Sequence, residues 1–188
     1  NRLSVATGTG TSPNMGLSPS RLFASAGDTL DFEVRLQSGG AAANGVSVVI
    51  GLESGFFEVV NAAAPFTDSG LVLPGGTVSE NTSTATQLRF AKSQLGGQVA
   101  GTELEPLLLA SFSLVAKSGF SGVRRLAFDD EAAISIAGSA LPLTKSSGMA
   151  VRQAEIRSLA RARIEAAALL EGRAAPLGNG DHSTLLDI

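Results

Sequence analysis

The sequence holds few side chains that could carry out a reaction. His182 is the single histidine among 188 residues, and it stands between Asp181 and Ser183. A Ser-His-Asp triad needs its three members held in place by rigid elements, and these three residues are neighbours near the end of the chain. Cysteine is absent, which excludes disulfides, thiolate metal ligands and a cysteine nucleophile. We therefore predict that the protein is not an enzyme and uses no cofactor.

Three consecutive acids are the candidate metal ligands. Asp129, Asp130 and Glu131 separate two apolar segments, so we expect them in a loop between two strands. Clustered carboxylates in a loop can bind Ca²⁺; the alternative, which we favour, is a solvated turn. Carboxylates such as Glu53 and Glu58 could do acid–base work in principle, and we interpret them as solvated charges.

Composition narrows the kind of partner. Charged residues make up only 16% of the chain, the net charge is −3, and Trp and Tyr are absent. The sequence has no basic stripe and no stacking platform, so we predict no nucleic-acid partner. The missing aromatic residues also argue against direct sugar binding. Asn81-Thr82-Ser83 matches the acceptor pattern for N-glycosylation, in what we expect to be a polar loop.

The cellular location is predicted from two weaker signs. No stretch approaches the 18 or so apolar residues that span a bilayer, so we predict that the protein is not transmembrane. The sequence begins with Asn1, which would fit removal of a signal peptide, although a trimmed chain would look the same. Together with the low charge, this favours a secreted or cell-surface protein.

Short strands dominate residues 1–152. Thr29–Leu36 alternates strictly, with Leu30, Phe32 and the next two apolar side chains on one face, as in a half-buried antiparallel strand. Gly45–Leu52 is a continuous run rich in β-branched residues, which is typical of a strand covered on both faces. The other expected strands are Leu3–Thr7, Arg21–Ala26, Phe56–Val60, Gln87–Lys92, Leu107–Val115, Val123–Phe128, Ala132–Ala137, Leu141–Thr144 and Met149–Arg152, and Gly8–Ser20 is expected to be a loop. The pattern of many short strands with turn residues between them predicts an all-β sandwich or barrel.

The periodicity changes after this domain. Residues 153–175 predict an amphipathic helix, whose apolar stripe includes Ile156, Leu159 and Ile164, and residues 176–188 form a short tail. Such a helix must dock on something to be stable. We expect interaction surfaces at both ends of the chain: Leu3 and Val5 in the first strand, the helical stripe, and Leu185, Leu186 and Ile188 in the tail. A strand added to a neighbouring copy would give a head-to-tail homo-oligomer or filament.

Five strand-like segments follow one another in an order that can be compared with that of a known family. They are Ala26-Gly-Asp-Thr-Leu-Asp-Phe-Glu-Val-Arg-Leu36; Gly45-Val-Ser-Val-Val-Ile-Gly-Leu52 with Phe57-Glu-Val-Val60; Leu88-Arg-Phe-Ala91; Leu108-Leu-Ala-Ser-Phe-Ser-Leu-Val-Ala116; and Gly138-Ser-Ala-Leu-Pro-Leu-Thr144 with Gly148-Met-Ala-Val151. This order resembles that of the bacterial cohesins, over roughly residues 3–152. One departure is that cohesins carry Tyr-Asp-Pro where this chain reads Leu52-Glu53-Ser54-Gly55.

The resemblance implies a fold and a kind of function. Cohesins are jelly-roll modules that bind dockerins in cellulosomes and are related in fold to carbohydrate-binding modules. The resemblance thus implies an antiparallel jelly-roll β-sandwich of about nine strands, followed in this chain by the C-terminal α-helix and short tail. It therefore implies a secreted, non-catalytic binding or assembly module, with a dockerin-like protein or another copy of the chain as partner. The departure at residues 52–55 touches the face that binds dockerin. The alternative function is a carbohydrate-binding accessory domain of an extracellular polysaccharide-degrading system.

Overall fold

The computed structural model describes residues 13–19, 22–37, 43–95, 106–136, 138–146 and 148–154. The chain divides into two compact units, Asn1–Gln153 and Ala154–Ile188. Apart from Ala154, the described residues all lie in the first unit, and the regular elements among them are all strands. The predicted N-terminal strand, the helix over 153–175 and the tail over 176–188 lie outside the described residues, apart from the first two positions of the predicted helix.

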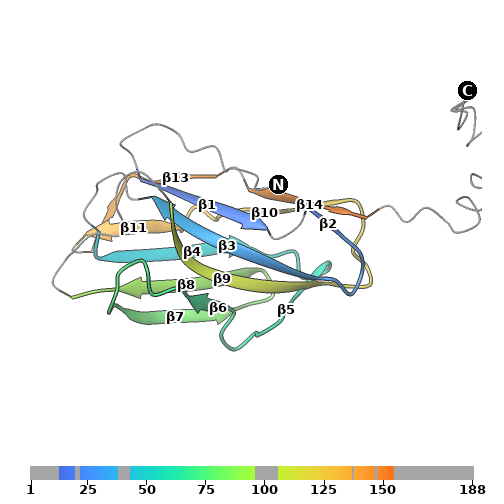
Figure 1. The fold of residues 1–188 in the computed structure, drawn as a ribbon, viewed down its shortest axis with the longest axis horizontal. Coiled ribbons are helices and arrows are strands. Elements are labelled where there is room, and N and C mark those ends of the chain that lie inside the picture. The colour runs from blue at the N-terminus through green and yellow to red at the C-terminus, as the bar shows by residue number, and fades with distance from the viewer. Residues whose placement is uncertain are drawn as a thin grey trace, which may run out of the picture. The chain divides into compact units, whose positions relative to one another are not determined.

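Two large sheets and one small sheet make up the domain. The first large sheet contains β1 (Asn14–Pro19), β3 (Thr29–Gln37), β5 (Phe57–Val59), β6 (Phe66–Asp68), β9 (Leu107–Ala116) and β13 (Thr144–Lys145). Its order is β13-β1-β3-β9-β5, and β6 also pairs with β9 (Figure 1). We refer to it as the β3–β9 sheet.

The second large sheet faces the first. It contains β4 (Gly45–Gly51), β7 (Thr77–Ser83), β8 (Gln87–Ser93), β11 (Ala133–Ile136) and β12 (Ser139–Leu141), in the order β12-β11-β4-β8-β7. The small sheet has the order β10-β14-β2, formed by β2 (Phe23–Ala24), β10 (Val123–Leu126) and β14 (Met149–Gln153). These are called the β4–β8 sheet and the β14 sheet below. Among the described strands, β1 with β13 and β14 with β2 pair in parallel, and all other pairings are antiparallel.

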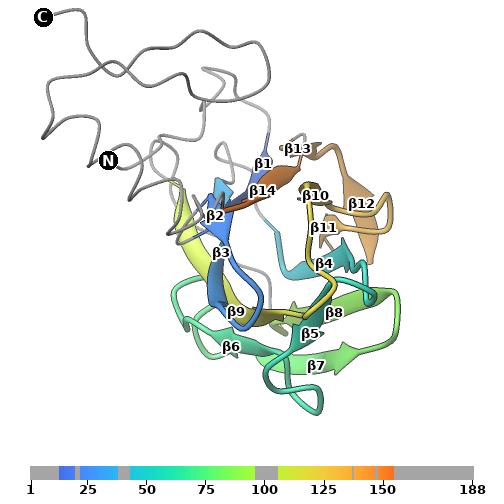
Figure 2. The same cartoon turned by 90° about the vertical axis from the view of Figure 1, so that its right-hand side faces the viewer.

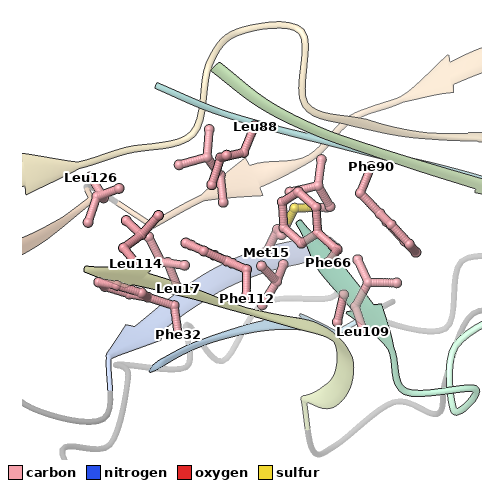
Figure 3. Close-up of a cluster of buried hydrophobic side chains, with 14 of the residues drawn as sticks. Met15, Leu17, Phe32, Phe66, Leu88, Phe90, Leu109, Phe112, Leu114 and Leu126 are labelled. Carbon is pink, nitrogen blue, oxygen red and sulfur yellow. The ribbon is translucent and has the colours of Figure 1, made fainter. Parts of the chain in front are cut away.

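A single apolar core joins the two large sheets. Phe32 and Phe112 lie in register on β3 and β9 and stack at 5.0 Å between ring centroids. The ring of Phe66 from β6 meets that of Phe90 from β8 at 5.5 Å, which ties one sheet to the other (Figure 3). The alternation predicted for β3 is confirmed, since its apolar side chains are buried and Asp31 faces solvent. The sheets therefore form a β-sandwich, as predicted.

Three strands, β1, β6 and β7, were not predicted from the sequence; β6 has only three residues. The prediction of a loop over Gly8–Ser20 is wrong for residues 14–19, which form β1 and bury Met15 and Leu17 in the core. Its Pro, Asn, Gly and Ser residues, which are typical of turns, concealed the two inward apolar side chains. Strand β7 was missed because it is polar along most of its length and half exposed. The described residues contain fourteen strands rather than about nine, because several have only two or three residues.

Side chains close one open side of the sandwich. Strands β6 and β7 belong to different sheets and lie next to each other in both views (Figure 2). The Asn81 amide spans them: its Oδ1 accepts from the Phe66 N–H at 2.9 Å and its Nδ2 donates to the Phe66 carbonyl at 2.8 Å. Asn81 thus lies in a strand, and the prediction that its acceptor motif is in a loop is wrong. The nitrogen that a glycan would modify is already committed to the fold.

A buried lysine holds the loop between β6 and β7. Lys92 is 2% exposed, and its Nζ lies 2.7 Å from Asp68 Oδ2 and donates to the Val72 carbonyl at 2.9 Å. These contacts satisfy a charge that would otherwise be costly to bury. The next residue, Leu73, is fully buried with φ at 49°, a conformation that costs energy for a residue other than glycine. Burial of the Leu73 side chain stabilises this turn.

Candidate functional site

The three predicted metal ligands lie in the turn between β10 and β11, where the protein's own side chains meet them. Asp129 Oδ2 accepts from Gln87 Nε2 at 3.2 Å, and Glu131 pairs with Arg89. Asp130 lies 3.8 Å from Lys145 Nζ, which also donates to the Asp129 carbonyl at 2.9 Å. No group of three or more His, Cys, Asp or Glu side chains converges within the described residues.

The other carboxylates considered for chemistry also lie apart. Glu53 is 3.7 Å from Arg124 Nη1, and the Arg124 guanidinium sits 3.4 Å above the centre of the Phe56 ring. Glu58 lies on β5, paired with Val115 on the exposed side of the β3–β9 sheet. His182 and the eight predicted interaction residues, Leu3, Val5, Ile156, Leu159, Ile164, Leu185, Leu186 and Ile188, are outside the described residues.

The outer side of the β4–β8 sheet carries a different kind of feature. Six small residues occupy two neighbouring rows across β11, β4 and β8: Ala133, Ser47 and Ala91 in one row, and Ser135, Gly45 and Ser93 in the other. They point away from the core because their alternate neighbours Val48 and Phe90 are fully buried on the inner side. No large side chain stands among the six, and we call this surface the plateau.

Close packing keeps the plateau flat. A Cβ atom on Gly45 would lie 2.5 Å from Ser135 Oγ, so a larger residue there would force that hydroxyl to move. The alternation of β4 also puts Val49 on this outer side, and its side chain is only 1% exposed. The prediction that this strand is covered on both faces is therefore confirmed at Val49. The residues of the plateau and the neighbouring Val49 are therefore closely packed.

A row of tethered polar side chains borders the plateau. Arg89 lies beside Val49 in register, and its guanidinium pairs with Glu131. Gln87 lies next along β8 and donates to Asp129. The acids first considered as metal ligands thus hold the long side chains of β8 in fixed positions. Sequence reasoning missed both plateau and border, because their members are separated by up to about ninety residues and meet only through strand order.

The segment that departs from the cohesin pattern, Leu52–Gly55, directly follows strand β4. Leu52 donates its N–H to the Thr86 carbonyl at 2.7 Å, and the Glu53 carbonyl accepts from both Phe56 and Phe57 N–H groups. Arg124 covers this turn through its contacts with Glu53 and Phe56. A closed turn capped by arginine therefore replaces Tyr-Asp-Pro in this chain.

The comparisons with known proteins concern the fold. No family model matches the chain, and no curated protein matches it. Among solved structures, CaCohA2 from Clostridium acetobutylicum has 15% identity, with 74% of this chain and 90% of that chain covered and a TM-score of 0.55. The third ScaB cohesin of R. flavefaciens, in complex with a group 1 dockerin, has 15% identity, 80% and 100% coverage and a TM-score of 0.57. A non-cellulosomal cohesin from the archaeon Archaeoglobus fulgidus has 10% identity, 77% and 92% coverage and a TM-score of 0.56.

These likenesses bear out the resemblance seen in the sequence. The matching chains are cohesin modules, and nearly the whole length of each is covered. In the part of the chain that the structure describes, no helix is long and apolar enough to cross a membrane. At this level of identity the comparison establishes architecture, and the described domain has the cohesin fold.

Proposed function

We propose that this domain is a non-catalytic module that holds a protein partner on the plateau of its β4–β8 sheet. CaCohA2 and the third ScaB cohesin of R. flavefaciens have both been solved in complex with dockerins, which supports a protein as the partner. The predicted absence of enzymatic activity agrees with this reading. A secreted or cell-surface location belongs to the same proposal.

The observation that carries the proposal is the plateau itself. Its small side chains let another backbone approach closely over three strands. The tethered Arg89 at its border offers a guanidinium whose position is already set by Glu131, so little side-chain entropy would be lost on binding. A polar border of this kind is a general feature of the rim of protein–protein interfaces.

The partner is a dockerin-like protein or a second copy of the chain. The arginine-capped turn at Leu52–Gly55 stands where cohesins have Tyr-Asp-Pro. We therefore expect a partner matched to this turn rather than any dockerin at random. A dockerin such as CaDoc0917 serves as a comparison probe.

A matched pair of substitutions tests the plateau. Ala91→Arg places a long side chain on the β8 side of the plateau, next to Ser47, whereas Ser111→Arg places one on the outer side of the β3–β9 sheet, opposite Glu33. Wild-type and variant chains would be used to capture exported proteins of the encoding organism, with CaDoc0917 tested alongside. We expect a partner retained by wild type and by Ser111→Arg, and lost by Ala91→Arg. Equal retention by both variants, or no partner with a strictly monomeric chain, would contradict the proposal.

Self-assembly through the ends of the chain is a separate part of the proposal. It rests on the strand-forming residues Leu3 and Val5 and on Leu185, Leu186 and Ile188 in the tail. Deleting 177–188 should abolish assembly, as measured by light scattering after size exclusion, and leave the sandwich folded. Assembly that persists after the deletion would remove the tail from this role.

A further inference from the structure

The outer side of the β14 sheet combines exposed apolar side chains with arginines. Register places Phe23 of β2 beside Arg152 of β14, and Arg152 beside Val123 of β10. Phe23 is 59% exposed and Val123 is 51% exposed, which is unusual for side chains of this size. Arg125 lies two residues after Val123 and shares its side of the strand, since Leu126 next to it is fully buried. We call this surface the arginine face.

Its two cations differ from the others in the described residues. Arg35, Arg89, Lys92, Arg124 and Lys145 each pair with a carboxylate, and Lys117 donates to the Ser54 carbonyl. The Arg152 backbone N–H donates to the Leu22 carbonyl at 2.8 Å, but the side chains of Arg125 and Arg152 make no hydrogen bond or ion pair with any residue that the structure describes. The strands β2, β10 and β14 contain no acid. A chain of net charge −3 therefore presents a local cationic surface here.

The spacing of this row indicates the shape of a ligand. Phe23 and Val123 are separated by two strand spacings, or about 9.6 Å, with Arg152 between them. Two turns of an α-helix advance about 10.5 Å over seven residues. An amphipathic helix crossing the strands could thus place apolar side chains at i and i+7 on Phe23 and Val123, and an acid at i+3 or i+4 on Arg152. Arginine favours such carboxylates through paired hydrogen bonds.

We propose that the arginine face docks an acidic, amphipathic helical segment of a protein partner. A polysaccharide would gain little from an isolated Phe in a chain without Trp or Tyr. A lipid surface would require a larger apolar face than two side chains provide. Exposed apolar side chains flanked by arginine are typical of interface hot spots. This site lies on a different sheet from the plateau and does not depend on the function proposed for it.

Two synthetic peptides provide the probe. Both are 18-residue amphipathic helices with the same leucine stripe, and their polar faces carry either glutamate or lysine. We expect the glutamate peptide to shift the backbone amide signals of Phe23, Val123 and Arg152 in NMR spectra of the full chain, and the lysine peptide to leave them unchanged. Equal binding of the two peptides, or shifts confined to other strands, would overturn the proposal.

Charge reversal tests the same site independently. The double substitution Arg125→Glu with Arg152→Glu should weaken binding of the glutamate peptide by at least about tenfold, since the attraction of Arg152 for the peptide acid and of the neighbouring Arg125 for the acidic face both become repulsion. The control Lys117→Glu, which reverses one exposed charge outside the β14 sheet, should leave the affinity unchanged. An unchanged affinity in the double variant would overturn the proposal. So would arginine-dependent binding to polygalacturonate or to phosphatidylglycerol vesicles without binding of the glutamate peptide, or self-association of the chain through this face.

Discussion

The plateau and the arginine face are two outward surfaces of one sandwich with opposite properties. On the plateau the side chains are small, and the bordering Arg89 is held by Glu131. On the arginine face Phe23 and Val123 are well exposed, and the side chain of Arg152 between them makes no hydrogen bond or ion pair with a described residue. The plateau therefore has small side chains and paired charges. The arginine face has exposed apolar side chains and arginine side chains without an ion pair to any described residue.

This difference separates two ways of recognising a protein. A flat surface with tethered charges selects a partner by shape and loses little freedom on binding. A surface with free arginines draws a partner by charge, so its affinity depends on ionic strength. The same fold can therefore hold one partner for its shape and attract another for its charge.

The largest expected effect concerns the core that supports both surfaces. Phe32 is fully buried and stacks on Phe112 at 5.0 Å, so Phe32→Ala should lower the free energy of unfolding by about 3–5 kcal/mol. Phe23→Ala should lower it by only about 0.5 kcal/mol, because Phe23 is 59% exposed. Urea denaturation of both variants makes the comparison. Similar losses for the two would mean that the arginine face is part of the core.

The next effect contrasts the two sides of β8. Lys92 is 2% exposed on the inner side, so Lys92→Ala leaves Asp68 and the Val72 carbonyl without their partner and should cost about 3 kcal/mol. Arg89 pairs with Glu131 on the outer side, in contact with solvent, and Arg89→Ala should cost about 1 kcal/mol or less. Denaturant titration measures both. A larger cost for Arg89 would show that the border of the plateau is structural rather than a binding feature.

Salt should separate the two surfaces in binding. Raising NaCl from about 50 to 500 mM should lower the affinity of the arginine face for the glutamate peptide by about tenfold. The reason is that exposed charges are screened over a few ångströms at the higher concentration. A partner held on the plateau should lose less than about threefold over the same range. Isothermal titration calorimetry at the two concentrations gives both ratios. Equal salt dependence would erase the distinction between the surfaces.

The smallest expected effect is on stability, when either arginine of the arginine face is replaced by alanine. Arg125→Ala and Arg152→Ala remove side chains that make no hydrogen bond or ion pair with a described residue, so each should change the free energy of unfolding by less than about 0.5 kcal/mol. Each of these substitutions should also lower the affinity for the glutamate peptide, because each removes one positive charge from the arginine face. A stability loss above about 1 kcal/mol in either variant would indicate an internal role for that arginine.

Local pattern predicted the strands that alternate in the sequence. Strand β3 was predicted because Leu30, Phe32 and Val34 alternate with polar residues, and its inward face is indeed buried. Strand β1 was missed because only Met15 and Leu17 carry the pattern among residues typical of turns. Strand β7 was missed because an exposed edge strand needs no apolar face.

The candidate surfaces lay beyond local pattern for a different reason. Ser47, Ala91 and Ala133 are unremarkable in the sequence and become neighbours only through the order of β11, β4 and β8. Phe23 lies beside Arg152 because β2 and β14, which are far apart in the sequence, pair in parallel. The acids at 129–131 were noticed, but their partners Arg89 and Lys145 come from other strands. Sites built by strand order require the structure.

Methyl groups on three surfaces allow one direct test of the plateau as the binding site. Ala91 and Ala133 lie on the plateau, Val115 on the outer side of the β3–β9 sheet, and Val123 on the arginine face. We would record methyl NMR spectra of the labelled full chain with and without the partner captured by the wild-type chain and lost by Ala91→Arg. The expected result is a shift of the Ala91 and Ala133 signals with Val115 unchanged. Shifts at Val115 with Ala91 and Ala133 unchanged would contradict the proposed function.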